Sequence, residues 1–299
     1  MSLTRRFFLR GAAAVAAGAA LPVPSVRAGA ACPSLPASPR RIVAIDYRTD
    51  VEPALVLGLP LVAGGYADDR PWVPFPDTTA RLALPAAVEH ILGFDPDLII
   101  CCADSPERDW WPYAQLSRAA PTLPTSFKSP WQADLRFLAR CLGLEERAEA
   151  AVADYEAMIA GMRRRHERVL ATRRIASVLY SARTKTYYVH APGASEWLGI
   201  KRAMLDDLGA RTVEPGSIEG DGVTVSSENI LEVLRGIDAI VIGDVGSGGL
   251  ADLDTDPIWR RLPAVEAGKV RAIPGNSNYG SLFTARFVAG EMDALLSSL

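Results

Sequence analysis

The chain has 299 residues, 49% of them hydrophobic, and a formal net charge of −3. This length and composition are sufficient for a large buried core and predict a globular protein that divides into two lobes. A mildly acidic chain is not typical of nucleic-acid-binding proteins, so we expect no nucleic acid among its partners.

The first 28 residues have the pattern of an export signal. Residues 4–10 read Thr-Arg-Arg-Phe-Phe-Leu-Arg and match the twin-arginine motif, and an apolar run follows over residues 11–21. The run is much shorter than the roughly 20 residues that cross a bilayer, and Pro22 and Pro24 interrupt any longer helix. We therefore predict that residues 1–28 are removed after export by the twin-arginine pathway and that the mature protein is periplasmic.

Two processing routes fit the end of this segment. Cleavage after Ala28 is favoured and leaves Gly29 as the first residue, whereas residues 29–32 also form an imperfect lipoprotein box in which Cys32 would carry a lipid. The lipid anchor is the less favoured alternative because Gly29 stands where such a box has a larger aliphatic residue. Cleavage removes four arginines and no acidic residue, which lowers the formal charge from −3 to −7.

The cysteines do not resemble a disulfide framework. They stand at Cys32, Cys101, Cys102 and Cys141, which is too few and too irregular a set. Cys101 and Cys102 end an apolar run, and neighbours in a strand point to opposite faces, so buried free thiols are favoured over a vicinal disulfide. We therefore expect a protein that does not need oxidation to fold.

Strand-like and helix-like segments alternate through the first half of the mature chain. This alternation predicts an N-terminal α/β lobe over residues 29–144, with a parallel sheet wrapped by helices. The expected strands are 41–45, 61–63, 97–102 and 121–123, and the expected helices are 50–57, 86–92, 110–119 and 131–142.

The longest helical pattern covers residues 145–171. Apolar or small residues recur along one face, and a helix of about 25 residues, at about 1.5 Å per residue, is roughly 40 Å long. Such a rod can bridge two lobes. The alternation then resumes and predicts a C-terminal α/β lobe over 172–299. Its expected strands are 175–180, 187–189, 239–242 and 270–273, with another near Val223, and its expected helices are 195–208 and 227–234.

Two glutamates occupy equivalent places in the two lobes. Glu89 and Glu228 each open a short helix that leads into a core strand. The helix dipole stabilises an acidic residue in the first turn by roughly 0.3–1 kcal/mol, which explains each glutamate separately. It does not explain equivalent positions in both lobes, so we expect two carboxylates at one end of the molecule, one from each lobe.

In this arrangement the chain resembles the periplasmic substrate-binding proteins of ABC importers for iron-siderophore complexes and vitamin B12. The resemblance covers nearly everything from Arg40 to Leu299. Residues 70–73, Arg-Pro-Trp-Val, are most similar to binders of hydroxamate siderophores. The resemblance rests on the order and spacing of segments 41–44, 52–60, 89–99, 116–122, 225–228, 257–265 and 268–270, together with the long helix.

This resemblance implies both an architecture and a function. It implies two rigid α/β lobes joined by one long helix, limited hinge closure, and a ligand cleft between the lobes. The implied ligand is a ferric siderophore, and the implied partner is an ABC permease whose arginines would pair with Glu89 and Glu228. We expect a monomer with no cofactor and no metal site of its own, because the iron arrives inside the siderophore.

Residues that follow strand ends are the candidates for ligand contact. A ferric siderophore combines an apolar organic shell with oxygen-rich, often anionic iron chelation, so aromatic rings and a few cations are a suitable lining. Trp259 is expected to be packing. The ligand-contact candidates are Arg48, Arg70, Trp72, Trp110, Trp111, Tyr113, Arg183, Tyr187 and Tyr279, with Tyr47, Lys185 and Tyr188 from the same loops.

Two departures from the hydroxamate pattern leave the ligand open. Residues 82–85 stand where hydroxamate binders carry an arginine, with Arg81 displaced, and residues 276–279 lack the aromatic bulk that relatives often place there. A corrinoid, haem or a ferric citrate-type chelate is therefore an alternative ligand.

A receptor for bare metal ions and a secreted α/β enzyme are the rival hypotheses. Zinc or manganese would need several converging imidazoles, and the chain has only His90, His166 and His190. The glycines of residues 246–251 formally fit a dinucleotide fingerprint, but the acidic segment 252–257 would repel a pyrophosphate. The nucleophile motif of α/β hydrolases is absent from the sequence, so we expect a binding protein and not an enzyme.

Overall fold

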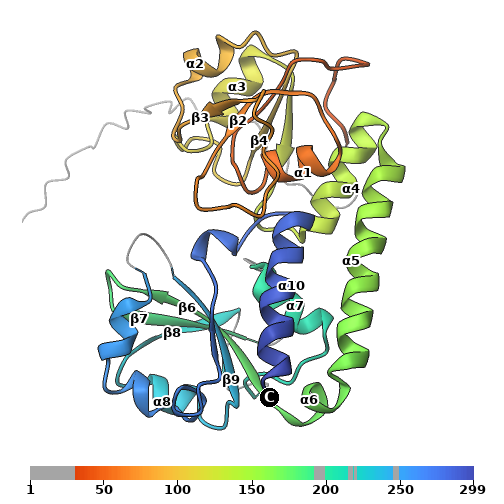
Figure 1. The fold of residues 1–299 in the computed structure, drawn as a ribbon. Coiled ribbons are helices and arrows are strands. Elements are labelled where there is room, and N and C mark those ends of the chain that lie inside the picture. Colours follow the sequence, from red (N-terminus) through yellow and green to blue (C-terminus); the bar gives the residue numbers. More distant parts are fainter. Residues whose placement is uncertain (1–30, 192–198, 215–217, 219–220, 245–248) are drawn as a thin grey trace, which may run out of the picture.

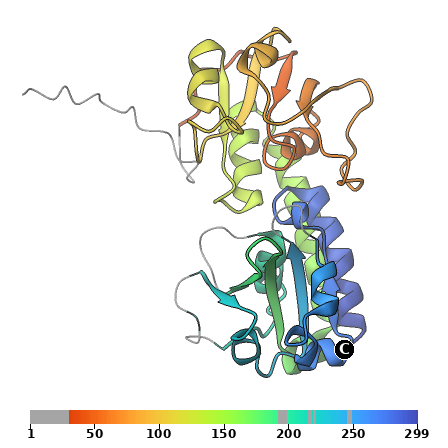
Figure 2. The same ribbon diagram turned by 90° about the vertical axis from the view of Figure 1, so that its left-hand side faces the viewer.

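The structure is a computed structural model that describes residues 31–191, 199–214, 218, 221–244 and 249–299. Two α/β lobes lie one above the other, each built around a five-stranded sheet, and a long helix, α5, runs along one side of both (Figure 1). A quarter turn places this helix behind the lobes (Figure 2). The two-lobed α/β fold expected from the sequence is confirmed. The predicted export signal lies outside the described residues.

The sheet of the N-terminal lobe is parallel throughout, in the order β3-β2-β1-β4-β5. Its two central strands, β1 and β4, are buried along their whole length, as is typical of a parallel sheet covered on both faces. The strands are β1 (Ile42–Ala44), β2 (Leu61–Gly65), β3 (Ala80–Leu82), β4 (Leu98–Cys102) and β5 (Thr122–Thr125), and the helices are α1 (Val51–Val56), α2 (Val88–Leu92), α3 (Tyr113–Ala119) and α4 (Trp131–Leu142).

The sheet of the C-terminal lobe is mixed, in the order β10-β9-β6-β7-β8. β7 is antiparallel to β6 because residues 182–185 form a short hairpin connection, and a parallel crossover needs a dozen or more residues. β7 is also antiparallel to its other neighbour, β8. The strands are β6 (Ile175–Ser181), β7 (Thr186–His190), β8 (Gly222–Ser226), β9 (Ala239–Asp244) and β10 (Val270–Ala272), and the helices are α7 (Ile200–Asp207), α8 (Ile230–Val233), α9 (Pro263–Glu266) and α10 (Leu282–Ser297), with 3-10 turns at Ala251–Thr255, Trp259–Arg261 and Gly275–Ser277.

The helix between the lobes is shorter than the predicted span of residues 145–171. α5 covers Glu145–Arg165, and a separate helix, α6, covers Glu167–Thr172. At the junction, Nη2 of Arg165 and Nε2 of His166 lie 2.7 and 2.8 Å from Oδ1 of Asp293 in α10. The break therefore lies where the chain is attached to the C-terminal helix, which the sequence pattern did not predict.

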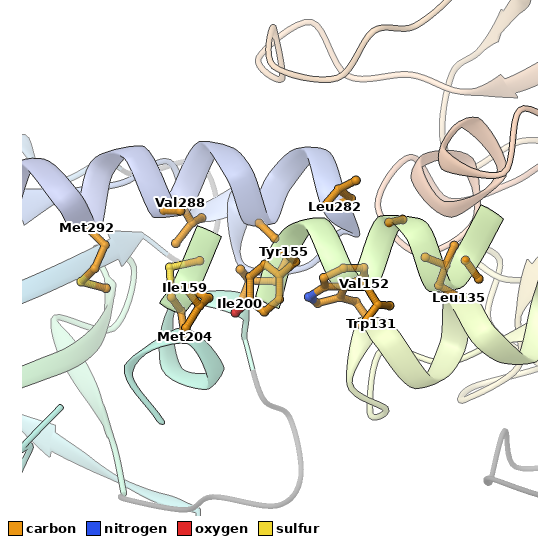
Figure 3. Packing of buried hydrophobic residues seen from close by; sticks show 14 of the residues in the cluster. Trp131, Leu135, Val152, Tyr155, Ile159, Ile200, Met204, Leu282, Val288 and Met292 are labelled. Carbon is orange, nitrogen blue, oxygen red and sulfur yellow. The ribbon is translucent and has the colours of Figure 1, made fainter. Parts of the chain in front are cut away.

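The two lobes share one hydrophobic cluster. Side chains of α4 and α5 pack against α7 and α10 without a polar layer between them, as the row from Leu135 and Trp131 through Tyr155 to Met204 and Met292 shows (Figure 3). The same cluster includes residues of β1 and β4 from one sheet and β6 and β9 from the other. Because its members span both sheets, the lobes are joined by packing as well as by the chain of α5.

The structure corrects the expectation for the cysteines. Cys32 and Cys141 form a disulfide that ties the segment before β1 to the end of α4. The pairing bridges 109 positions in sequence, so the spacing of the cysteines gave no indication of it. A Cys32 sulfur engaged in this bond cannot also carry a lipid. Cys101 and Cys102 are buried free thiols, and burial raises the pKa of both.

Candidate functional site

The strand order of the N-terminal lobe creates a crevice between β1 and β4. From β1 the chain adds β2 and β3 on one side and then crosses over to add β4 and β5 on the other. In open α/β sheets, ligands bind at the carboxyl ends of the strands where this order reverses, because the two flanking loops diverge there. The loops concerned cover residues 45–50 after β1 and residues 103–112 after β4.

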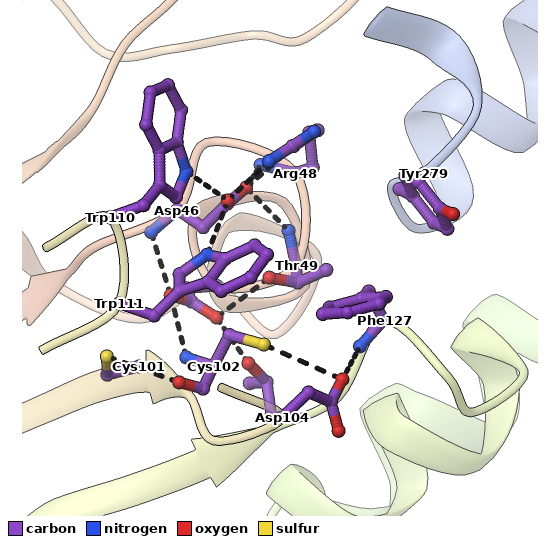
Figure 4. Close-up of polar contacts among 12 residues, drawn as sticks. Asp46, Arg48, Thr49, Cys101, Cys102, Asp104, Trp110, Trp111, Phe127 and Tyr279 are labelled. Atoms are coloured by element: carbon purple, nitrogen blue, oxygen red, sulfur yellow. Dashed lines mark hydrogen bonds and ion pairs between the residues drawn. The ribbon is translucent and has the colours of Figure 1, made fainter. Parts of the chain in front are cut away.

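The carboxylate of Asp46 organises this crevice (Figure 4). Its Oδ2 accepts hydrogen bonds from Nε1 of both Trp110 and Trp111, at 2.9 and 2.8 Å, and from Nη2 of Arg48 at 2.8 Å. Its Oδ1 accepts from the backbone N and Nε of Arg48 and, at 3.4 Å, from the backbone N of Thr49. Asp46 is completely buried, so these donors take the place of water.

Charge pairing keeps both members of the central ion pair ionised. Burial alone would raise the pKa of Asp46, but the charge and hydrogen bonds of Arg48 outweigh it and hold that pKa well below its usual range. Burial would likewise lower the pKa of Arg48, and the charge of Asp46 raises it instead. The two side chains therefore form a fixed carboxylate–guanidinium unit at neutral pH.

A second carboxyl group, Asp50, lies directly beneath this unit. Its oxygens accept hydrogen bonds from the backbone N of Asp46 at 2.7 Å, the backbone N of Cys102 at 3.2 Å and the hydroxyls of Thr49 and Thr125. Burial and, after it, the charge of Asp46 raise the pKa of Asp50 to about 8. Asp50 therefore links the loop after β1 to the ends of β4 and β5.

A cavity of about 120 Å³ opens next to the Asp46 unit. It is far smaller than the 300–1,000 Å³ of typical pockets for organic ligands, so a larger ligand would place only part of itself here. The lining residues are Arg48, Thr49, Ser105, Arg108, Trp111, Phe127 and Tyr279.

Three aromatic rings form the apolar part of this lining. The ring centres of Trp111 and Phe127 are 5.1 Å apart in a stacked arrangement, and Tyr279 meets Phe127 edge-on at 5.8 Å. Tyr279 precedes α10 and lies opposite the N-terminal loops (Figure 4). The cavity is thus lined by residues from both halves of the chain, and four of the predicted ligand-contact residues lie at it or beside it: Arg48, Trp110, Trp111 and Tyr279.

Arg70 and Trp72 do not line this cavity, and their contact with a ligand stays a prediction. Nη2 of Arg70 donates to Glu52 Oε2 at 2.7 Å and to the Thr284 hydroxyl at 2.5 Å, and its side chain is only 2% exposed. Trp72 stacks on Phe287 of α10, with ring centres 4.0 Å apart and planes 6° apart, and its Nε1 donates to the Thr284 hydroxyl. Both residues therefore attach the loop after β2 to α10.

Tyr113 and Tyr187 are buried in hydrophobic clusters and do not line the cavity. Tyr113 begins α3 and packs among the apolar residues behind the N-terminal sheet. Tyr187 stacks on Trp259, with ring centres 5.4 Å apart, and its hydroxyl donates to Asp256. Trp259 is itself buried, in line with its expected role in packing. A β-strand alternates its faces, and Tyr187 lies on the inner one.

The remaining candidates lie outside the cavity lining. Arg183 and Lys185 are exposed in the β6–β7 hairpin. Tyr47 is half-buried under the guanidinium groups of Arg48 and Arg70, which lie 4.9 and 5.2 Å from its ring centre. Tyr188 covers Gly222, where a Cβ would lie 2.5 Å from its ring.

Sequence reasoning missed five residues of the site: Asp46, Thr49, Ser105, Arg108 and Phe127. Asp46 had a usable signal, because an acidic residue follows directly on the apolar strand β1 at an edge where parallel strands end. Arg108 and Phe127 had none, since their approach depends on how the loops after β4 and β5 fold.

Glu89 and Glu228 are both exposed. Glu89 is in the first turn of α2, whereas Glu228 precedes α8 in a turn and is not inside the helix. α2 and α8 belong to different lobes and lie on the side of the molecule away from α5 (Figures 1 and 2). This arrangement is compatible with a partner that contacts both lobes at once.

The described residues contain no group of three or more histidine, cysteine or acidic side chains placed to hold a metal ion. The histidines are dispersed over α2, the junction of α5 with α6, and β7. Within the same residues, no helix has the length and apolarity needed to cross a bilayer. The glycine pattern 246–251 falls partly outside the described residues.

Comparison with known proteins identifies relatives over most of the chain. A family model described as periplasmic binding protein matches residues 75–276. The iron(3+)-hydroxamate-binding protein FhuD of Escherichia coli is 26% identical over 272 residues, which cover 85% of this chain and 86% of that protein.

Solved structures show the same fold. A FhuD fold-family component of a Fep/Fec-like ferrichrome ABC transporter from Bacillus subtilis has a TM-score of 0.73 at 21% identity, covering 89% of this chain and 97% of its own. The FhuD siderophore-binding protein of Vibrio cholerae, solved with Fe3+-Desferal, has a TM-score of 0.69 at 18% identity, covering 87% and 98%. With a family model that matches more than half of its length, the chain belongs to the periplasmic binding protein family.

Proposed function

We propose that this protein captures a ferric siderophore outside the cytoplasm and delivers it to an ABC permease. The observation that carries the proposal is the cavity at the reversal point of the N-terminal sheet, where Arg48 and Trp111 from one lobe face Tyr279 from the other half of the chain. Aromatic faces suit the organic shell of such a chelate, and guanidinium groups suit its oxygen-rich centre. Membership of the family and the siderophore ligands named for the relatives support this choice.

Fluorescence titration tests the proposal directly. Trp110 and Trp111 lie at the cavity, so a bound iron chelate should quench their emission. The panel comprises ferric hydroxamate, ferric catecholate and ferric citrate-type chelates, with haem and a corrinoid as the alternative ligands. Saturable quenching by a ferric siderophore supports the proposal, whereas saturation by the corrinoid or haem alone, or by none of the panel, contradicts it.

Two tryptophans provide a matched pair of variants. Trp111→Ala removes a wall of the cavity and should weaken siderophore binding by about tenfold or more. Trp72→Ala removes a ring that stacks on Phe287 and should lower the melting temperature while leaving affinity within about twofold. Isothermal titration calorimetry and thermal unfolding measure the two effects. If Trp72→Ala weakened binding and Trp111→Ala did not, the ligand would bind near Trp72 and not in the cavity at Trp111.

We also propose export by the twin-arginine pathway, on the basis of residues 4–10. Replacement of Arg5 and Arg6 by lysine should leave the protein in the cytoplasmic fraction of its host. If that variant still appears outside the cytoplasm in normal amounts, the protein is exported by another pathway.

A further inference from the structure

The charged side chains among the described residues that line the cavity are both positive. Seven described residues line it; among these seven, Arg48 and Arg108 are the only ones charged at neutral pH, and none is a carboxylate. The remaining polar groups are hydroxyls, of Thr49, Ser105 and Tyr279. A ligand in this space therefore meets two cations and uncharged donors.

Arg48 presents one edge of its guanidinium group to solvent and keeps the other occupied. Nε and Nη2 are taken by Asp46, at 3.0 and 2.8 Å, and the side chain remains 21% exposed. Nη1 has no hydrogen-bond partner among the described residues and is not buried. Because Asp46 fixes the plane of the group, the free donors point in a set direction and lose little entropy when a ligand oxygen binds.

Arg108 has no side-chain partner in the described part of the chain. Its backbone is held, because its N donates to Ser105 O at 3.0 Å and its O accepts from Trp111 N at 2.9 Å. The side chain is exposed and makes neither a hydrogen bond nor an ion pair with a described residue. A complete guanidinium fork is therefore available at the cavity, on a loop of fixed shape.

The nearby carboxylates do not satisfy these donors. Asp46 already accepts six hydrogen bonds, and Asp104 accepts from the Ser126 hydroxyl and, at 2.7 Å, from the backbone N of Phe127. Glu107 and Asp109 flank Arg108 in sequence but do not belong to the lining. They reduce the long-range positive potential, so any preference for anions arises from direct contact and should depend only weakly on salt.

We propose that the cavity selects ferric chelates with negatively charged oxygens on the part that enters it, and that Arg48 and Arg108 make this selection. The inference rests on the proposed function. A guanidinium already makes a charge-assisted hydrogen bond to a neutral oxygen, and an anionic oxygen adds the Coulomb attraction between opposite charges. An anionic chelate therefore gains more from the two arginines than a neutral chelate of similar size.

Arg81 does not contribute to this selection. Its guanidinium lies over the ring of Tyr66, 3.9 Å from the ring centre, and Arg81 is absent from the cavity lining. The site thus depends on arginines of the loops after β1 and β4, in a geometry that the hydroxamate pattern of the sequence did not predict.

The test compares two chelates and three variants of the mature protein. The probes are a neutral cyclic ferric trihydroxamate and a trianionic ferric tricatecholate, titrated by tryptophan quenching at low and high salt. We expect the wild type to bind the tricatecholate at least about tenfold more tightly. Arg108→Gln should remove most of that difference by weakening the tricatecholate about tenfold while changing the trihydroxamate by less than about twofold. Arg108→Lys, which keeps the charge but not the fork, should give an intermediate result.

Arg118→Gln is the matched control, because Arg118 is an exposed arginine of α3 outside the cavity lining whose side chain pairs with no residue of the described ranges. It should bind both chelates as the wild type does. Tighter binding of the neutral chelate by the wild type, or an equal effect of Arg108→Gln on both chelates, would overturn the selection while leaving siderophore capture intact. If neither chelate quenches the wild type, the proposed function itself is contradicted.

Discussion

Asp46 orients three side chains at or beside the cavity through one carboxylate. Arg48 and the indoles of Trp110 and Trp111 all donate to it, and each would otherwise adopt several rotamers in an open crevice. A ligand that binds pre-ordered side chains does not have to order them, so we expect Asp46 to contribute to affinity without touching the ligand.

Asp46→Asn tests this positioning role. The amide keeps the shape of the carboxylate, but its nitrogen cannot accept a hydrogen bond, so Arg48 loses its ion pair and some of the donors lose their acceptor. We expect siderophore affinity to fall by about tenfold or more and the free energy of unfolding to fall by roughly 3 kcal/mol, because one member of a buried pair is removed. Calorimetry and denaturant unfolding measure the two losses. Asp77→Asn, at an exposed carboxylate of the same lobe, should change neither.

His190 should make stability depend on pH. Burial lowers its pKa to about 4, from 6.5, with smaller contributions from the charges of Lys201 and Arg202, and its Nδ1 lies 3.1 Å from Ser177 O. Because the unfolded chain binds a proton between pH 6.5 and 4 that the folded protein does not, the free energy of unfolding falls as the pH decreases through this range. The full effect is roughly 3 kcal/mol.

Denaturant titrations of the wild type and His190→Gln at several pH values isolate this effect from the acidic groups that titrate nearby. The difference between the two proteins should be constant above pH 7 and should shift in favour of the variant as the pH decreases from 6.5 to 4. A difference that does not change with pH would show that His190 is not buried in its neutral form.

At the scale of elements, α4 is held at both ends. Trp131 at its start belongs to the core shared by the lobes, and Cys141 near its end is bonded to Cys32. The bond converts the 109-residue separation into a closed loop, which restricts the unfolded chain more than the folded one.

Cys141→Ser should therefore lower the free energy of unfolding by roughly 2–4 kcal/mol. Siderophore affinity should remain unchanged, because Cys141 is outside the cavity lining. The wild type in the presence of a reductant should resemble the variant in urea unfolding. If reductant has no effect on the wild type, the two cysteines are not bonded in the folded protein.

Some elements could be predicted from sequence, and the reasons differ from one to the next. α4 begins and ends at the predicted residues because its apolar positions recur at helical spacing. α10 was missed although it covers Leu282–Ser297, since its apolar residues are distributed around much of the helix and show no clear stripe. β3 was missed because three residues carry too little pattern.

The site was less predictable than the fold, because long-range contacts decide it. Arg48, Trp111 and Tyr279 follow strands or connect elements, and that rule brought them to the cavity. Arg70 and Trp72 obey the same rule but bind α10 instead, since Glu52 and Phe287 lie within reach. Sequence alone does not tell these two outcomes apart.

At the scale of the whole molecule, a buried ion pair reinforces the contact between the N-terminal lobe and α10. Glu52 Oε1 accepts from the backbone N of Thr284 in the first turn of α10, where the helix dipole favours a negative charge, and its Oε2 binds Arg70. Together with the shared core, these bonds hold α10 against α1, which fits the limited hinge movement that the family resemblance implies.

We expect limited hinge movement to hold Glu89 and Glu228 at a nearly constant separation, which suits recognition by a partner that contacts both lobes, such as a permease. The double variant Glu89→Ala/Glu228→Ala should bind siderophore as the wild type does, because neither residue lines the cavity. In cells that lack the native protein, it should reduce siderophore-dependent iron uptake by about tenfold or more.

The control variant Glu146→Ala/Glu167→Ala removes two exposed carboxylates on the opposite side, from α5 and α6, and should leave uptake intact. Radiolabelled ferric siderophore measures transport and calorimetry measures binding. If the docking variant transports normally, or if both double variants lose transport equally, the permease does not recognise this pair of glutamates.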